Sequence, residues 1–257
     1  MIAIRFPDQS VREYASGITV LEVAQSISEG LARNVLSAQF NQQTVEAATA
    51  LTQDGDLKLF TWKDQEGQSA FWHSSAHILA QSILACYPSA KLTIGPAIEN
   101  GFYYDVDFGD TSISEKDLVA LEKQFLTFAR EKYPFQMRAV SKKEALEYYQ
   151  KENNSYKIEL IEGLEDGTIT FCDHANFTDL CRGGHLPHTG FVKAVKLLNI
   201  AGAYWRGDEN NTQLTRIYGI SFPKQKELTE YLQRVEEAKK RDHRKLGKEL
   251  ELFTFSQ

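Results

Sequence analysis

The order of local patterns in the first sixty residues narrows the fold more than any other part of the chain. Residues 2–6 alternate apolar and polar side chains, a turn cluster follows, and residues 11–14 resume the alternation, which is typical of a β-hairpin. Thr19 and Glu22 form a capping box ahead of apolar residues at helical spacing. Short strand-like runs then cover residues 35–40, 46–50 and 57–61. A hairpin, one helix and further short strands predict a β-grasp (ubiquitin-like) topology over residues 1–62, with a generic α+β module as the alternative.

Residues 63–223 are interpreted as a second, larger α+β domain. Apolar residues at helical spacing predict a helix over residues 72–87, which a following proline ends. A second helix is predicted at about 115–132, and a third begins at the capping box formed by Ser141 and Glu144. Strand-like runs between and after these helices cover residues 91–94, 102–108, 168–172 and 215–222. We find no internal repeat and no low-complexity segment.

From residue 224 the sequence becomes strongly charged. Residues 224–245 keep apolar side chains at helical spacing, which predicts a half-exposed linker helix. Its basic end has two interpretations: a solvated helix terminus, or a contact with the phosphates of an RNA. The candidate RNA-binding residues are Lys239, Lys240, Arg241, Arg244 and Lys245. Residues 246–257 leave no room for a further folded unit, so we expect the chain to be a piece of a longer protein.

Composition excludes several classes of protein. No apolar run approaches the roughly 18 residues that a membrane helix needs, and the N-terminus lacks the features of a signal peptide. Three cysteines do not make a disulfide framework. We therefore expect a cytoplasmic protein without a membrane partner. The net charge of −6 argues against a surface devoted wholly to nucleic acid, but it leaves room for a local basic stripe.

Two pairs of candidate ligating residues stand far apart in the sequence. His73 and His77 lie four residues apart, on one face of the predicted helix, where they could bind a metal or a polar substrate. A zinc-protease helix would need Glu directly after the first histidine, and Ser74 stands there instead. Cys181 and His185 repeat the same gap within a glycine-rich segment that cannot form a stable helix.

These four side chains together would complete a tetrahedral zinc site, and their spacing permits this without deciding it. Each pair alone is most often incidental. The full set, with Asp179 two residues before Cys181, favours a polar pocket. At this point the metal site and the metal-free pocket both stay open.

Three motifs carry a resemblance to a known family. The segments His73–His77, Asp179–His185 and Gly202–Asp208 closely resemble the N-terminal half of bacterial threonyl-tRNA synthetases. Two later segments, Leu214–Gly219 and Arg241–Gly247, fit the same family. The resemblance covers essentially the whole chain, in order.

The resemblance implies a domain order. A β-grasp TGS domain over 1–62 would precede an editing domain over 63–223, a linker helix over 224–245 and the start of the class II catalytic core at 246–257. ATP, magnesium and zinc belong with that core, so no cofactor is expected for this chain. One departure is Gly184, where the family usually has proline, and we expect it to loosen the loop that presents His185.

The resemblance also implies an activity, the hydrolysis of serine wrongly esterified to the threonine tRNA. One methyl group distinguishes the two amino acids and provides only about 1–3 kcal/mol of discrimination in a pocket, so a second, hydrolytic selection is needed. The expected partner is the acceptor end of tRNA(Thr). The chain should not charge tRNA by itself. We expect it to be monomeric, because dimerisation of the full-length homodimer relies largely on the core.

Six candidate catalytic residues follow from the same resemblance. Asp179 would hold the serine ammonium or order the water, Cys181 would line the side-chain pocket, and His73 would engage the terminal ribose hydroxyl. His77 and His185 would complete the polar cup. Lys157 is the remaining candidate, and it matches a family lysine thought to position the water.

Two further residues are candidates for substrate binding. Tyr104 would stack on the terminal adenine, as aromatic side chains commonly do with splayed bases, with a buried strand aromatic as the alternative. Gly95 would let the backbone approach closely. No catalytic metal is expected, because a metal would occupy the groups needed to hold the seryl moiety.

Two other functions remain as alternatives. One is an RNA-binding or regulatory module in which the His and Cys set forms a structural zinc knot. The other is a free-standing trans-editing deacylase, against which the linker helix at 224–245 argues.

Overall fold

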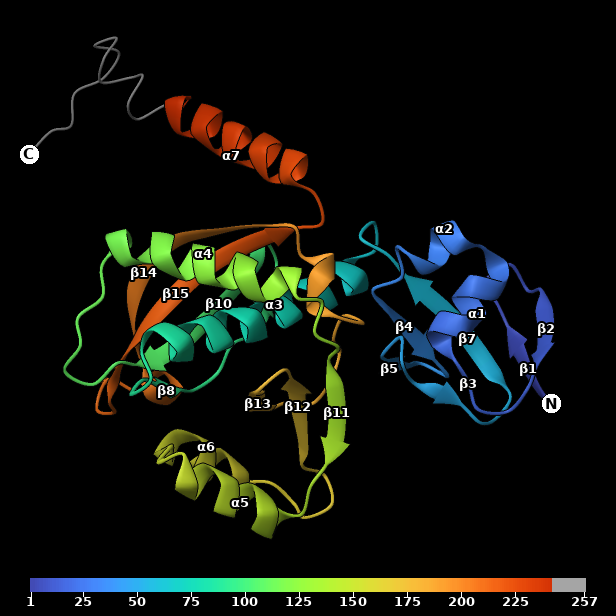
Figure 1. The fold of residues 1–257 in the computed structure, drawn as a ribbon, viewed down its shortest axis with the longest axis horizontal. Coiled ribbons are helices and arrows are strands. Elements are labelled where there is room, and N and C mark those ends of the chain that lie inside the picture. Colours follow the sequence, from blue (N-terminus) through green and yellow to red (C-terminus); the bar gives the residue numbers. More distant parts are fainter. Residues whose placement is uncertain (242–257) are drawn as a thin grey trace, which may run out of the picture.

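The N-terminal domain is a β-grasp fold, as the sequence predicts. The computed structural model describes residues 1–241, and its first sheet has the strand order β2-β1-β7-β4-β5 (Figure 1). The central pair, β1 and β7, is parallel, and a short pair, β3 and β6, lies beside the sheet. The elements are β1 (Ile2–Arg5), β2 (Val11–Tyr14), β3 (Ile18–Thr19), α1 (Val20–Ile27), α2 (Glu29–Ala32), β4 (Ser37–Phe40), β5 (Gln43–Val45), β6 (Ala50–Leu51) and β7 (Gly55–Phe60).

The expected capping box starts the helix of this domain. The Glu22 backbone N–H donates to Thr19 Oγ1 at 3.2 Å, and the Thr19 N–H donates to Glu22 Oε2 at 2.8 Å. Val20 and Val23 of α1 then pack against the buried face of the sheet. The strand expected over residues 46–50 is wrong, because residues 46–49 form a turn in which the Thr49 N–H donates to the Glu46 carbonyl.

The second domain is built on an antiparallel sheet that two helices cover. The strand order is β14-β15-β10-β8, with β9 paired to β10. Both α3 and α4 lie on one face of this sheet (Figure 1). The elements are α3 (Gln65–Cys86), β8 (Lys91–Leu92), β9 (Ala97–Ile98), β10 (Gly101–Asp107), α4 (Glu115–Arg130), β14 (Ala194–Tyr204) and β15 (Gln213–Phe222).

A smaller sheet with two helices forms the lower part of this domain in Figure 1. Its strand order is β11-β12-β13, and it has a hydrophobic cluster of its own with α5 and α6. The end of β13 leads directly into the glycine-rich segment that carries Cys181. The elements are β11 (Gln136–Ala139), α5 (Lys142–Lys151), α6 (Ser155–Glu162), β12 (Thr170–His174) and β13 (Phe177–Leu180).

Several elements of the second domain differ from the prediction, since β9, β11, β13 and α6 were not expected. Helix α3 begins at Gln65 rather than at residue 72, because Asp64 accepts the Thr61 N–H at 2.8 Å and turns the chain into the helix early. Strand β14 was not predicted. Its residues do not alternate cleanly, since the register shifts between Leu197 and Asn199.

The predicted linker helix is present as α7 (Gln225–Lys240), and it is largely exposed with Leu228 buried. Lys240 pairs with Glu236 at 2.7 Å and Arg241 with Glu237 at 3.5 Å, both one helical turn away. Two candidate RNA contacts, Arg244 and Lys245, and the predicted start of the core at 246–257 lie outside the described residues. Within the described residues, no helix has the length and apolar character needed to cross a membrane.

Gly67, in the first turn of α3, should resist any larger side chain. A Cβ atom added there would lie 2.1 Å from the carbonyl oxygen of Thr61. We expect Gly67→Ala to lower the free energy of unfolding by about 1–3 kcal/mol, the usual cost of overpacking, in a urea titration. The matched control is Gly30→Ala in α2, where the nearest atom is Ser28 Oγ at 3.6 Å, so stability should hold or rise. Equal effects of the two substitutions would contradict the prediction.

Candidate functional site

The two pairs of candidate ligating residues meet in space. His73 and His77 project from α3, and Cys181 and His185 come from the loop after β13. The four ligand atoms all lie within 4.8 Å of one another. Cys181 Sγ is 3.0 Å from His73 Nε2 and 3.3 Å from His185 Nε2. The tertiary fold therefore builds one site from segments about a hundred residues apart.

The glycine-rich loop turns back onto α3 because it has two residues with positive φ. Gly183 and Gly184 have φ values of +101° and +89°. After this turn the Leu186 N–H donates to Ser74 Oγ at 2.9 Å, which fixes the loop against the helix turn that carries His73. Proline is locked near φ −65°, so a relative with proline at position 184 needs a different local backbone.

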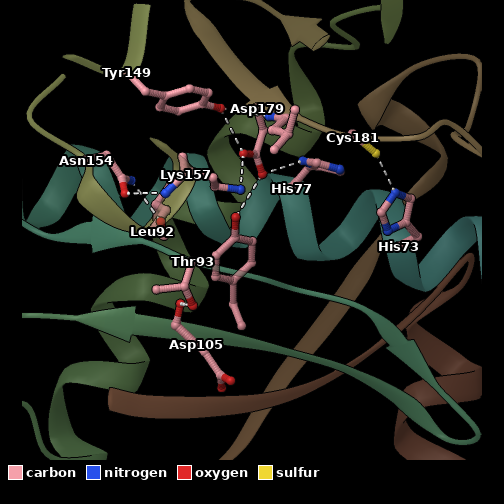
Figure 2. Close-up of polar contacts among 12 residues, drawn as sticks. His73, His77, Leu92, Thr93, Asp105, Tyr149, Asn154, Lys157, Asp179 and Cys181 are labelled. Carbon is pink, nitrogen blue, oxygen red and sulfur yellow. Dashed lines mark hydrogen bonds and ion pairs between the residues drawn. The ribbon is translucent and has the colours of Figure 1, made fainter. Parts of the chain in front are cut away.

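Asp179 lies at the centre of the site with its carboxylate fully enclosed (Figure 2). Lys157 Nζ is 2.5 Å from Oδ1, and the hydroxyls of Tyr104 and Tyr149 donate to the carboxylate at 2.8 and 3.3 Å. The His77 Nδ1 atom is 3.4 Å from Oδ2. Burial by itself would raise the pKa of Asp179, but the Lys157 ammonium and His77 hold it well below its usual range.

Helix α6 delivers Lys157 to this carboxylate. The Asn154 side chain caps the helix by accepting the Lys157 N–H at 3.1 Å, and its amide donates to the Leu92 carbonyl at 2.8 Å (Figure 2). The Lys157 side chain is 3% exposed. Since Lys157 and the two tyrosines already use both oxygens of Asp179, a substrate ammonium would have to share an occupied carboxylate.

The stacking role expected for Tyr104 is wrong. Its side chain is 1% exposed and its hydroxyl is committed to Asp179, so no face of the ring is free for a base. Tyr104 is instead a buried aromatic residue of a strand, which was the alternative interpretation. The close approach expected at Gly95 is made by this same ring, because a Cβ atom at Gly95 would lie 2.1 Å from Tyr104 Cδ2.

The charges around Cys181 favour a thiolate. Burial alone would raise the pKa of the Cys181 thiol, but His77 and His185 lower it well below its ordinary value. Burial tends to lower the pKa of His185, whereas contacts with Cys172, Cys181 and Glu46 raise it well above its ordinary value. These contacts therefore favour the thiolate form of Cys181 and the protonated form of His185.

Six of the candidate residues line a common cavity, whereas His185 and Tyr104 do not. The cavity has a volume of about 510 Å³. Gly95, Ile94 and Pro96 form another part of its wall. Its polar lining consists of His73, His77, Lys157, Thr168, Thr170, Asp179, Cys181 and Arg182.

The donor set also fits a metal ion. Three imidazoles and one thiolate are ligands that zinc accepts in structural sites, and their mutual approach within 4.8 Å is compatible with one shared ion. His185 would offer Nε2, because its Nδ1 is engaged by Glu46. The ligand chemistry alone therefore allows both a zinc site and a metal-free polar pocket.

Sequence reasoning missed three residues that shape the site. Tyr149 and Asn154 hold Asp179 and Lys157, and Glu46 of the N-terminal domain contacts His185 Nδ1 at 2.7 Å. No spacing rule connects these residues to the motifs, since each contact depends on packing between elements.

Removing the buried ammonium should be costly. Lys157→Met would leave the Asp179 charge enclosed without its main partner, and we expect the free energy of unfolding to fall by about 3–5 kcal/mol. The measurement is chemical denaturation at pH 7. Lys151→Met, an exposed lysine of α5, is the matched control and should change stability little. A Lys157→Met protein as stable as its control would contradict this assignment of the ion pair.

Comparisons with known proteins agree with the assignment of the N-terminal domain and match part of the second domain to a known one. The TGS domain model matches residues 2–61, and the model described as "Threonyl and Alanyl tRNA synthetase second additional domain" matches residues 169–218, which include Asp179, Cys181 and His185. The whole chain aligns with proteins named threonine–tRNA ligase. Identity is 64% with that of Flavobacterium psychrophilum, 65% with that of Flavobacterium johnsoniae and 58% with that of Cytophaga hutchinsonii.

The chain spans 39–40% of the length of these three relatives while all of it is aligned. Both domain models fall within it in the order expected from the sequence, and the residues of the site lie partly inside the second one. The chain therefore carries a TGS domain followed by the second additional domain of threonyl and alanyl tRNA synthetases, and over its whole length it is similar to part of the threonine–tRNA ligases.

Proposed function

We propose that this site hydrolyses the ester of serine wrongly attached to the threonine tRNA. The observation that supports the proposal best is the convergence of His73, His77, Cys181 and His185 beside a buried lysine–aspartate pair, at a cavity of about 510 Å³. The similarity to threonine–tRNA ligases supports a tRNA-linked substrate. Hydrolysis of the ester requires a placed water, a proton acceptor and a positive field for the developing oxyanion.

His73 is the best proton acceptor in the set. Its ring is half-buried, and burial lowers its pKa, so it is neutral near pH 7. With Nε2 donating to the Cys181 thiolate at 3.0 Å, the neutral ring keeps Nδ1 unprotonated. In this assignment Nδ1 takes the proton from the attacking water, or from the ribose hydroxyl that holds it.

Positive charge is available where the oxyanion forms. The Lys157 ammonium lines the cavity, and protonated His185 lies behind Cys181. Both groups are held by buried partners, so little reorganisation accompanies the reaction. The sulfur of Cys181 forms part of the wall that would contact the side chain of the bound amino acid, where serine fits and the extra methyl of threonine is excluded.

The acceptor end of the tRNA is the proposed partner. The described basic residues Lys239, Lys240 and Arg241 are exposed at the end of α7 and are candidates for phosphate contacts. The monomeric state and the absence of a resident cofactor stay predictions for this chain.

Hydrolysis should depend on the two residues closest to the proposed chemistry. We expect His73→Ala and Cys181→Ala to reduce the rate of seryl-tRNA(Thr) deacylation by about 10²–10⁴-fold, the usual range for a lost general base or its partner. The assay follows release of labelled serine, with threonyl-tRNA(Thr) as the rejected substrate. Cys86→Ala is the matched control, because Cys86 is an exposed cysteine at the end of α3. Full activity in both site variants would refute the proposed function.

The zinc knot is the second candidate, because the same four donors suit a zinc ion. The zinc knot and the metal-free hydrolytic site predict different results when a chelator removes bound metal. We expect chelator-treated protein, shown by metal analysis to be free of zinc, to keep its melting temperature and its deacylase activity. Unfolding on chelation, reversed by zinc, would favour the structural knot. Activity lost on chelation without unfolding, and restored by zinc, would identify a catalytic metal instead.

A further inference from the structure

The N-terminal domain contributes one side chain to the site of the second domain. Glu46 Oε1 lies 2.7 Å from His185 Nδ1 and 3.4 Å from the His185 backbone nitrogen. The His185 side chain is fully enclosed, and that of Glu46 is 16% exposed. The two residues are 139 positions apart. This contact is therefore a sheltered ion pair across the domain interface.

The fold of the N-terminal domain fixes Glu46 in place. The residue opens the turn between β5 and β6, where the Thr49 N–H donates to the Glu46 carbonyl at 3.0 Å. The Leu21 N–H at the start of α1 donates to the Ala47 carbonyl at 2.9 Å. The carboxylate thus stands on a turn that is tied to the helix of its own domain.

This contact sets the chemistry of the His185 ring. When Nδ1–H donates to the Glu46 carboxylate, Nε2 is the atom that faces Cys181 Sγ at 3.3 Å. The carboxylate stabilises the imidazolium, and the imidazolium in turn stabilises the Cys181 thiolate that accepts from His73. Three consecutive contacts therefore link the N-terminal domain to the proposed proton acceptor.

The other titratable groups around His185 do not supply a second carboxylate. Burial raises the pKa of Cys172 to about 11 and lowers that of His174 to about 3, so both are neutral near pH 7. The His73 and His77 rings lie 4.9 Å from the His185 ring between centroids and carry no negative charge. Among the described residues, Glu46 supplies the one carboxylate that forms an ion pair with His185.

We propose that Glu46 is a positioning residue of the hydrolytic site, so that the site is complete only when the N-terminal domain is docked. This rests on the proposed function. Glu46 does not line the cavity that holds the candidate catalytic residues, and it acts through His185. The N-terminal domain is then a part of the site, and its displacement would remove the carboxylate from His185.

The test compares three variants of the full chain. Glu46→Gln keeps a hydrogen-bond acceptor without the charge, Glu46→Asp keeps the charge on a shorter side chain, and Glu13→Gln is the control at an exposed glutamate of the same domain. Seryl-tRNA(Thr) deacylation gives kcat and KM from pH 5 to 9. Imidazole ¹⁵N NMR, with His185 signals assigned from a His185→Asn protein, reports ring protonation independently of activity.

We expect Glu46→Gln to lower kcat by about 10–100-fold, as when the carboxylate partner of a functional imidazole is removed, with little change in KM. Because the His185 Nδ1 atom loses its carboxylate partner at 2.7 Å, the ¹⁵N signals of the His185 ring should shift relative to those of the unmodified chain. Glu46→Asp should recover part of the rate, and Glu13→Gln should match the unmodified chain.

The outcomes separate this inference from the proposed function. Unchanged kcat together with unchanged His185 signals in Glu46→Gln would overturn the positioning role. An unmodified chain that does not deacylate seryl-tRNA(Thr) would overturn the proposed function, while the His185 ring signals in Glu46→Gln still decide whether Glu46 positions His185. If Glu46→Gln does not fold by circular dichroism, Glu46→Ala takes its place. Unchanged kcat together with unchanged His185 signals in that protein would then overturn the role.

Discussion

A carboxylate removed from water has to be matched by donors, and in this protein that requirement ties the second domain together at Asp179. Its partners come from four elements: His77 from α3, Tyr104 from β10, Tyr149 from α5 and Lys157 from α6. Each of these elements must be correctly packed before the charge is satisfied. Because an unpaired buried charge is strongly unfavourable, the arrangement that stabilises the domain is also the one that assembles the site.

Charges of alternating sign continue from this centre toward the domain interface. Lys157 balances Asp179, His77 lies between Asp179 and Cys181, and protonated His185 lies between Cys181 and Glu46. This alternation of charge stabilises the buried thiolate of Cys181, because the nearest neighbours of the sulfur are imidazoles rather than anions. It also explains why one edge of the site depends on another domain, since the last carboxylate comes from the turn after β5.

Local signals predicted the parts of the fold that short-range physics controls. The capping box at Thr19 is present as expected, because its hydrogen bonds join residues three positions apart. The prediction of a strand over residues 46–50 was wrong, because the side-chain composition did not reveal the turn that follows β5 there. The stacking role predicted for Tyr104 was wrong for a different reason. Whether a strand aromatic faces solvent or the core depends on what packs on that face, and here α3 and the Asp179 carboxylate lie on it.

The sequence by itself determined the β-grasp domain, the long helix that presents His73 and His77, and a glycine-rich loop able to present Cys181 and His185. These follow from residue spacing, capping and backbone freedom, which act within a few positions. Only the tertiary structure decided that the two pairs meet, that Asp179 is already saturated with donors, and that Glu46 engages His185. Such contacts join residues from 22 to 139 positions apart, and their formation depends on how whole elements pack.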